Sequence, residues 1–221
     1  MPPQISIHPA LNALAPDLVV GCLSADVKVE KHNEALWREI DQHLAHLTAS
    51  IKPDQINSTP QIAAMRQAYK ALGKDPSRYR GSAEALLRRV LSGKGLYQIN
   101  SVVDINNLVS LESLNPAGTY DLEKITPPIE LRIGSVGESY KGIGKDLINI
   151  ESLPVFADAA GPFGSPTSDS ERAMVRLETR NVLMVVFSFT GPEGLEHRVS
   201  RAGELLRRHC GGEGIETSLV T

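Results

Sequence analysis

The sequence predicts an α+β fold in which helices pack against β-sheet. Three observations predict this class. Apolar residues recur at helical spacing in the first half, short apolar segments separated by glycine and proline fill the second half, and one more helical segment precedes a final strand. Because the chain has 221 residues and no linker, repeat or low-complexity stretch, we expect a single domain over 1–221.

The N-terminal part begins with two strand signals, at residues 4–8 and 17–29. The second contains LVVGCLSADVKV, which starts as an apolar run and then alternates between apolar and polar residues. A helix is expected over about 31–50, where apolar residues return every three or four positions. That apolar stripe consists of Leu36, Ile40, Leu44 and Leu47.

The next two helices are marked by their end residues. Thr59 suits the N-cap of the first, Pro60 its first helical position, and Gly73 the position just past its end. Ser82 is expected to cap the second helix, and Gly93 to close it. The leucines and valine between them place an apolar stripe on one side of that helix.

The segment at 102–114, VVDINNLVSLESL, is a third helix candidate, and the chain turns to β character after Pro116. TYDLEKI, PIELRI, SLPVFAD and NVLMVVFSF are strand-like, and the last is apolar throughout, as expected of a strand buried on both faces. A helix over 194–209 and the strand IETSLV close the chain. GPFGSPTSDSE, at 161–171, is expected to be a mobile loop because it is rich in Gly, Pro and Ser.

The motifs of several enzyme classes are missing. Cys22 and Cys210 are far apart and in no motif, which excludes a disulfide scaffold and argues against a zinc site. The Gly-rich GESYKGIG has Ile143 where a phosphate-binding loop requires lysine. His43 and His46 share a helix face but have no further ligand marked in the sequence. No cofactor and no metal are therefore expected.

The charge and hydropathy patterns predict a soluble, cytoplasmic protein. The N-terminus has neither a basic leader nor a long apolar core, and no window approaches 18 uninterrupted apolar residues, so no membrane partner is expected. A net charge of −3 gives no global attraction to nucleic acid, and no DNA partner is expected. Aromatic residues make up only 5% of the chain, which argues against base-stacking platforms of the kind that single-strand binders use.

One segment differs in charge from the rest of the chain. Between Arg66 and Lys94 there are eight basic residues and two acidic ones, a local charge of +6. The basic residues are Arg66, Lys70, Lys74, Arg78, Arg80, Arg88, Arg89 and Lys94. Such a concentration can bind a phosphate backbone. Two solvated helix faces would give the same pattern, and the composition does not decide between them.

Two segments carry a family resemblance. VVDINNLVSLESLNPAGTYDLEKI followed by PIELRIGSVGES resembles the editing, or tRNA-binding, domain (B-three/B-four) of the phenylalanyl-tRNA synthetase beta subunit. Upstream, DPSRYRGSAEALLRRVLSGKGL resembles stand-alone members of the same family. The resemblance covers about residues 65–190. It implies a B-three/B-four-like fold, with mixed, sandwich-like sheets and helices packed outside.

The resemblance also implies a function and a site. A free-standing relative would bind tRNA and hydrolyse mischarged aminoacyl-tRNA in trans, as a deacylase and not a ligase, with no protein nucleophile. The family's pocket positions fall on Asn106, Asn107, Pro116, Gly118, Gly161, Gly164 and Met184. Phosphate contacts would come from Arg78, Arg80, Arg88, Arg89 and Lys94. No catalytic residue is assigned.

Two departures from the family pattern bear on specificity. The family's pocket histidine is replaced by Gly118, and the glutamate that reads a tyrosine hydroxyl falls near Met184. A site without that acceptor should not select a phenolic hydroxyl strongly. Two other functions stay open: a non-catalytic RNA-binding module, and a protein that binds a small molecule such as an amino acid. Asn106 and Asn107 could equally hydrogen-bond the following turn, and Gly118 could be required for a positive φ.

Overall fold

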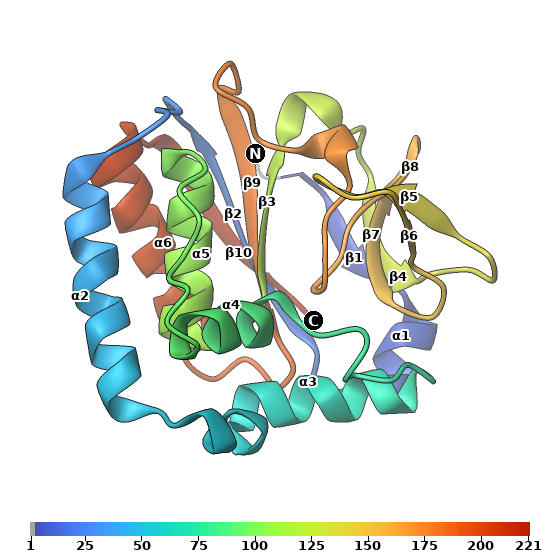
Figure 1. The fold of residues 1–221 in the computed structure, drawn as a ribbon. Helices are drawn as coiled ribbons and strands as arrows, with labels where there is room; N and C mark the ends of the chain where they lie inside the picture. The colour runs from blue at the N-terminus through green and yellow to red at the C-terminus, as the bar shows by residue number, and fades with distance from the viewer. Residues whose placement is uncertain (1–2) are drawn as a thin grey trace.

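Two four-stranded sheets face each other in the computed structural model, which describes residues 3–221 (Figure 1). The central sheet has the order β10 (Glu213–Val220), β2 (Val19–Asp26), β9 (Asn181–Ser188), β3 (Ala117–Asp121), with antiparallel neighbours throughout. The second has the order β1 (Ile5–Ile7), β4 (Ile129–Ile133), β7 (Pro154–Asp158), β8 (Gly161–Gly164), and its β1–β4 pair is parallel. A hairpin joins β5 (Ser139–Lys141) to β6 (Leu147–Asn149). The predicted α+β class with mixed, sandwich-like sheets is confirmed.

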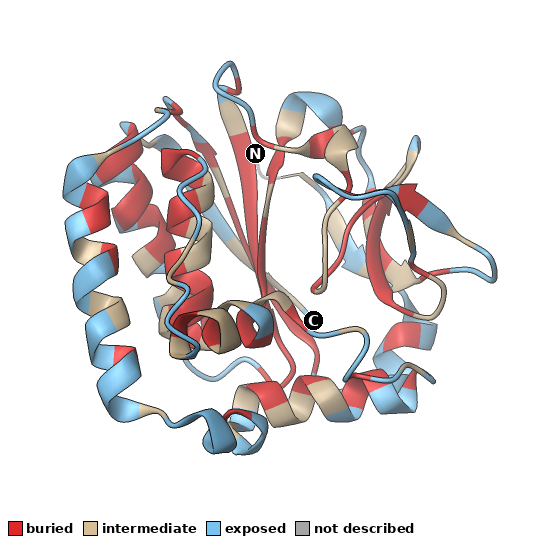
Figure 2. Cartoon of the chain, viewed as in Figure 1, coloured by how far each residue is buried: buried red, intermediate tan, exposed pale blue. Residues whose placement is uncertain are grey.

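Strand β9 divides the interior into two layers. Leu183, Val185 and Phe187 belong to the apolar cluster between the two sheets, whereas Met184 and Val186 belong to the cluster under the helices. Side chains alternate across a strand, so one apolar run supplies both layers. The prediction that NVLMVVFSF is buried on both faces is confirmed, and the strand is buried from Val182 to Ser188 (Figure 2).

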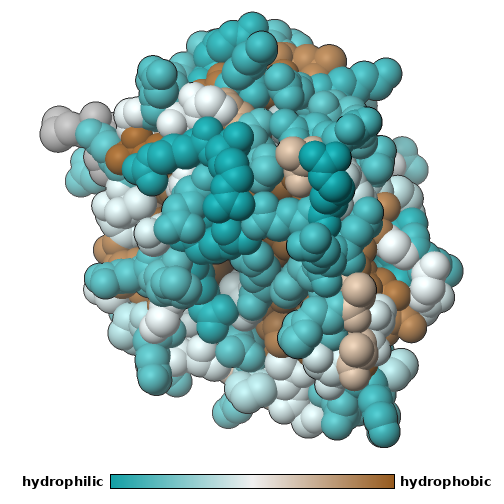
Figure 3. Space-filling model, turned by 90° about the vertical axis from the view of Figure 1, so that its left-hand side faces the viewer, coloured by the Kyte–Doolittle hydropathy of each residue, from teal (hydrophilic) through white to brown (hydrophobic). Residues whose placement is uncertain are grey.

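Three helices cover the outer face of the central sheet. Helices α5 (Ser101–Ser113) and α6 (Leu195–Cys210) pack on the strands, and α2 (Glu34–Ser50) lies outside them (Figure 1). Helix α2 buries Leu36, Trp37, Ile40 and Leu47, close to the stripe expected from the sequence. The surface on this side is mostly hydrophilic (Figure 3).

Helices α3 (Pro60–Ala71) and α4 (Ser82–Leu91) lie near one end of the sheets, and α1 (Pro9–Leu14) lies beside the second sheet (Figure 1). Short 3-10 turns cover Pro53–Ser58, Leu122–Lys124 and Glu171–Ala173. Helix α1 has only six residues, too few to give a helical period in the sequence.

The expected helix ends are confirmed at α3 and at the C-terminal end of α4, where Gly93 follows the C-cap with a φ of +76°, but the N-terminal end of α4 is shifted. Thr59 occupies the N-cap position of α3, and Gly73, just past its end, has a φ of +81°. At α4 the N-cap is Gly81, and Ser82 is the first helical residue. The backbone N–H of Ser82 donates to the carbonyl of Pro166 at 2.8 Å. That tertiary partner replaces the side-chain cap that the sequence suggested.

The segment 161–171, expected from its composition to be a loop, is partly a strand and is held by tertiary hydrogen bonds. It contains β8, and Ser170 and Glu171 lead into a 3-10 turn. Hydroxyls from three distant tyrosines hold its polar residues: Tyr120, Tyr140 and Tyr69 bond to Asp169, Ser168 and Thr167 respectively. These partners lie at least 28 positions away, so the local sequence gave no sign of them. Within residues 3–221, no helix has both the length and the hydrophobicity to span a membrane.

Candidate functional site

Three arginines surround one buried carboxylate on α4. Glu84 is 2% exposed and receives Arg66 Nη1 at 3.0 Å and Arg88 Nε at 2.8 Å. The guanidinium of Arg80 lies 3.8 Å from the same carboxylate. Because one negative charge faces three positive ones, this basic cluster (Arg66, Arg80, Arg88) keeps an excess of two positive charges.

The side chains of the basic cluster are held in place by further hydrogen bonds within the chain. Arg66 comes from α3, where its Nη1 also donates to the carbonyl of Pro76 at 3.3 Å. Arg88 reaches Asn57 Oδ1 with its Nη2 at 2.6 Å. Side chains that are already fixed lose less conformational entropy when they bind a phosphate. These contacts show that Arg66 and Arg88 are ordered by the fold, which is compatible with a phosphate-binding surface and with a purely structural ion-pair cluster.

The other side chains predicted to contact phosphate form fewer interactions with the rest of the chain. Arg89 packs over the ring of Tyr97, and its Nη2 donates to the carbonyl of Lys94 at 3.3 Å. Arg78 and Lys94 are exposed, and among residues 3–221 neither side chain forms an ion pair. The charges of Arg78 and Lys94 are therefore not neutralised by an acidic partner within residues 3–221.

A polar loop, residues 165–169, lies beside the apolar cluster that fills the region between the two sheets. Asp169 Oδ1 accepts hydrogen bonds from the Tyr120 hydroxyl at 2.8 Å and from the backbone N–H of Ser165 at 3.1 Å. The Ser165 hydroxyl donates to the carbonyl of Ser168 at 2.7 Å, and Lys145 Nζ donates to the Ser168 hydroxyl at 3.0 Å. Within the described chain, Oδ2 of Asp169 accepts no hydrogen bond. One carboxylate oxygen therefore remains available to another donor.

The environment of Asp169 moves its titration toward neutrality. Burial raises the pKa of Asp169 to about 6, while the bonds from Tyr120 and Ser165 and the charge of Lys145 act in the opposite direction. The pKa of Tyr120 is well above its usual range, first because of burial and then because of the neighbouring carboxylate. Asp169 is thus a carboxyl group that can exchange a proton near physiological pH.

Two predicted pocket glycines make room for the Tyr120 hydroxyl. A Cβ on either Gly118 or Gly164 would collide with the phenolic oxygen. Gly118 has no positive φ, so close approach of the Tyr120 ring, and not backbone conformation, explains the glycine there. The ring also packs edge-on against Phe163 at 5.0 Å between centroids. In this structure the space between the two glycines is occupied by the protein's own side chain.

The basic cluster and the polar loop are contiguous. The Ser82 N–H that opens α4 bonds to Pro166 in the polar loop, and the Tyr69 hydroxyl of α3 lies 2.9 Å from Thr167 Oγ1. Gly81 packs so that a Cβ there would lie 3.4 Å from the ring of Pro116. The helices that carry the arginines therefore touch the loop that carries Asp169.

The structure does not bring all seven predicted pocket residues together. Gly118 and Gly164 flank the Tyr120 hydroxyl that bonds to Asp169, and Pro116 lies next to Gly81, just before α4. Asn106 lies on the opposite face of β3, where its amide accepts from the Thr119 hydroxyl at 2.9 Å. Met184 is 1% exposed in the layer under the helices.

The remaining two predicted residues also lie apart from the polar loop. Asn107 is half-buried on α5 and, among the described residues, makes no side-chain hydrogen bond. Gly161 begins β8, at the other end of that strand from Gly164, and its carbonyl accepts from Arg172.

Sequence reasoning missed Glu84, Tyr97, Tyr120 and Asp169. A signal for Glu84 was present, because Arg80 and Arg88 stand four residues before and after it, and Glu84 and Arg88 fall on one face of α4. Asp169 had no such signal, since its partner Tyr120 is 49 positions away. Within residues 3–221 no group of three or more His, Cys, Asp or Glu is arranged to hold a metal.

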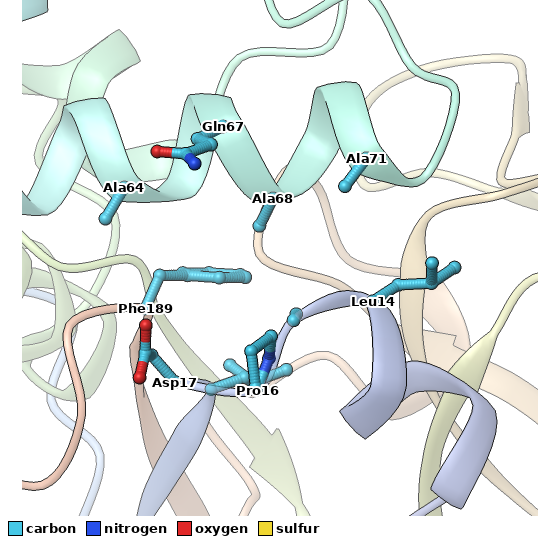
Figure 4. Close-up of a pocket in the computed structure, with 10 residues that line it drawn as sticks. Leu14, Pro16, Asp17, Ala64, Gln67, Ala68, Ala71 and Phe189 are labelled. Atoms are coloured by element: carbon cyan, nitrogen blue, oxygen red, sulfur yellow. The ribbon is translucent and has the colours of Figure 1, made fainter.

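A separate cleft of about 190 Å³ lies between α3 and residues 14–18. Helix α3 presents Ala64, Ala68 and Ala71 toward Phe189 and Leu14 across it (Figure 4). The side chains of its lining are mostly apolar, with Asp17 and Gln67 as the polar exceptions. This cleft shares α3 with the basic cluster but has no residue of the polar loop.

Comparison with known proteins gives consistent matches. The model of the family described as "B3/4 domain" matches residues 64–211, which include the basic cluster and the polar loop. A phenylalanine–tRNA ligase beta subunit from Yersinia pestis is 33% identical over 125 residues, covering 53% of this chain and 15% of that protein. The corresponding subunit from Chromobacterium violaceum is 27% identical over 180 residues, covering 75% and 23%. These alignments therefore cover less than a quarter of either relative.

A solved structure is similar as well. An N-terminal fragment of the phenylalanyl-tRNA synthetase beta-subunit from Pyrococcus horikoshii aligns with 100% of this chain and 51% of that fragment. The TM-score is 0.47 and the sequence identity 13%.

Proposed function

Because this chain belongs to the B3/4 domain family, which it shares with phenylalanine–tRNA ligase beta subunits, we propose that it binds tRNA and hydrolyses mischarged aminoacyl-tRNA in trans. One observation carries the proposal: α4 joins the basic cluster to the polar loop through the Ser82–Pro166 hydrogen bond. A tRNA held by the arginines would bring its aminoacyl end to that loop.

The phosphate contacts are assigned to the basic cluster and to three further basic residues of the segment 66–94. Arg80 and Arg88 have 49% and 35% of their side chains exposed, although both are oriented by Glu84. Guanidinium groups fixed in this way suit bidentate phosphate contacts. Arg78, Arg89 and Lys94 would add weaker, mainly electrostatic attraction.

We assign the proton transfer to Asp169. A water attacks the ester carbonyl of the aminoacyl group while Asp169 accepts a proton from that water. The bond between the carbonyl carbon and the ribose oxygen breaks, the amino acid leaves with the oxygen of the water in its carboxyl group, and the released ribose oxygen takes the proton from Asp169 to become a hydroxyl. A carboxylate with a pKa of about 6 is well matched to this role near neutral pH.

We narrow the pocket to the residues beside the polar loop. Pro116, Gly118 and Gly164 would border the aminoacyl group, with Tyr120 at its base. Asn106, Asn107, Gly161 and Met184 would act through the fold and not through contact with substrate. No phenolic selectivity is proposed, because Met184, the position that the resemblance assigns to the hydroxyl-reading acceptor, does not line this pocket.

The test is deacylation of a panel of mischarged tRNAs. The native protein should release the amino acid from at least one of them, and Asp169→Asn should slow that release by roughly 100-fold or more. Absence of turnover across the panel at high protein concentration would refute the enzymatic proposal.

One observation favours a second candidate, a tRNA-binding module without catalysis. The Tyr120 hydroxyl fills the space between Gly118 and Gly164, where an aminoacyl side chain would otherwise enter. Salt-dependent tRNA binding without any deacylation would select this candidate.

A further inference from the structure

One exposed aromatic ring lies against Arg89 of α4. Tyr97 is 60% exposed, in the segment 92–100 that runs from α4 back alongside α5 (Figures 1 and 2). The guanidinium carbon of Arg89 lies 3.7 Å from the centre of its ring. Arg89 Nη1 also donates to the Tyr97 hydroxyl at 2.9 Å. The ring is therefore braced on one face, and its large exposed fraction leaves the other face open.

The segment that carries Tyr97 is fixed both before and after this residue in the sequence. Gly93 and Gly95 have φ values of +76° and +59°, which set the course of the chain as it leaves α4. Leu96 packs into the apolar layers under the helices. On the other side, the backbone N–H of Ile99 donates to Asp104 Oδ1 at 3.0 Å. An exposed ring on so constrained a segment loses little entropy when it contacts a ligand.

The surroundings of the ring are positive. Within residues 3–221, no carboxylate pairs with Arg89, whose hydrogen bonds go to the Tyr97 hydroxyl and the Lys94 carbonyl. Lys94 is exposed, and Arg88 precedes Arg89 on the same helix. A flat ring supported by a cation and flanked by further cations suits a ligand with a flat π-face and a negative backbone.

We propose that Tyr97 is a stacking platform for one unpaired base of the bound RNA. This inference rests on the proposed tRNA binding and names a contact within it. A paired base is covered above and below by its neighbours, so only an unstacked base in a loop or at an end can lie on the ring. Lys94 and Arg88 would contact the phosphates on either side. One ring serves one base, which is compatible with the low aromatic content of the chain.

The experiment compares single-stranded RNA, the matching duplex and tRNA as ligands of the full chain. The single strand carries a fluorescent 2-aminopurine at one unpaired position, which reports stacking by quenching. Tyr97→Ala should weaken single-strand and tRNA binding roughly 5- to 100-fold, abolish the quenching and leave the salt dependence unchanged. Tyr97→Phe keeps the ring and should bind within about twofold of the native protein. Leu147→Ala removes another exposed apolar side chain, 75% exposed on β6, and should change nothing.

The outcomes separate this inference from the proposed function. If the native protein binds tRNA and Tyr97→Ala binds equally well, stacking is refuted and tRNA binding stands. If Tyr97→Phe loses as much affinity as Tyr97→Ala, the hydroxyl and not the ring is responsible, which also refutes stacking. If the native protein binds neither the single-stranded RNA nor the tRNA, both proposals fail. Circular dichroism melting of each variant checks that the fold is kept.

Discussion

Glu84 is the residue on which the order of the basic cluster depends. Its buried carboxylate accepts from Arg66 and Arg88 and lies close to Arg80. Without that charge, three guanidinium groups would face one another unneutralised. Electrostatics therefore explain why an acidic residue belongs in a segment otherwise suited to phosphate binding.

Replacing Glu84 should destabilise the fold. We expect Glu84→Gln to lower the free energy of unfolding by about 1–3 kcal/mol, because the arginines lose a buried counter-ion. Urea denaturation measures the change. Glu204→Gln, on the exposed face of α6, removes the same charge from a residue that forms no ion pair within residues 3–221, and should have an effect below about 0.5 kcal/mol. Equal effects of the two variants would contradict the role given to Glu84.

The raised pKa of Asp169 predicts how stability depends on pH. Folding favours the protonated form, since burial lifts the pKa from 3.8 to about 6. The contribution of Asp169 to stability is therefore fully present below about pH 4 and is lost as the pH rises through 6. Unfolding free energies of native protein and Asp169→Asn, measured from pH 3.5 to 7.5, should differ by an amount that changes across this window. A constant difference would show that Asp169 titrates normally.

At the scale of elements, much of the fold could be predicted because long helices and buried strands carry their own periodicity. The expected helices at 31–50 and 194–209 correspond to α2 and α6 within a few residues. Short elements such as α1 and β8 were missed because six or four residues hold too little of any period. The hydrogen bonds that hold the loop after β8 could not be predicted, since they come from distant tyrosines.

The contact between α4 and the polar loop gives a prediction about one helix end. Proline is well tolerated at a first helical position, and Gly81 has the extended backbone that a following proline requires. Ser82→Pro should therefore keep α4 but remove the N–H that bonds to Pro166. Hydrogen exchange of the Thr167 and Ser168 amides should become faster, whereas Ser82→Ala, which retains the donor, should leave it unchanged. Unaltered exchange in Ser82→Pro would show that α4 does not hold the loop.

At the scale of the whole molecule, the charge is uneven: a chain of net −3 has a segment of local charge +6. The sequence revealed this imbalance, but only the tertiary structure shows that the basic cluster contacts the polar loop. The assignment of Met184 and Gly118 to one pocket could not be checked from the sequence, because it depends on the strand register. In the structure Gly118 pairs with Val185, so Gly118 and the Met184 side chain face opposite sides of the central sheet.

The uneven charge predicts how the proposed tRNA binding should depend on salt. The plot of log affinity against log salt has a negative slope. Reversing the charges of Arg80 and Arg88 should make this slope shallower by about 1 to 2, because two phosphate contacts are lost. Reversing Arg207, an exposed arginine on α6, changes the total charge without touching the basic cluster and should leave the slope almost unchanged. A similar loss in both proteins would mean that net charge alone governs binding.

The central claim is that the basic cluster binds the tRNA while the adjoining polar loop cleaves its ester. Single-turnover deacylation of mischarged tRNA, followed over rising protein concentration, separates the two steps. Charge reversal at Arg80 and Arg88 should raise the half-saturating concentration at least roughly tenfold and leave the maximal rate within about threefold, whereas Asp169→Asn should lower the maximal rate roughly 100-fold with half-saturation unchanged. An Asp169→Asn protein as fast as the native one, or arginine variants with unchanged half-saturation, would contradict the claim.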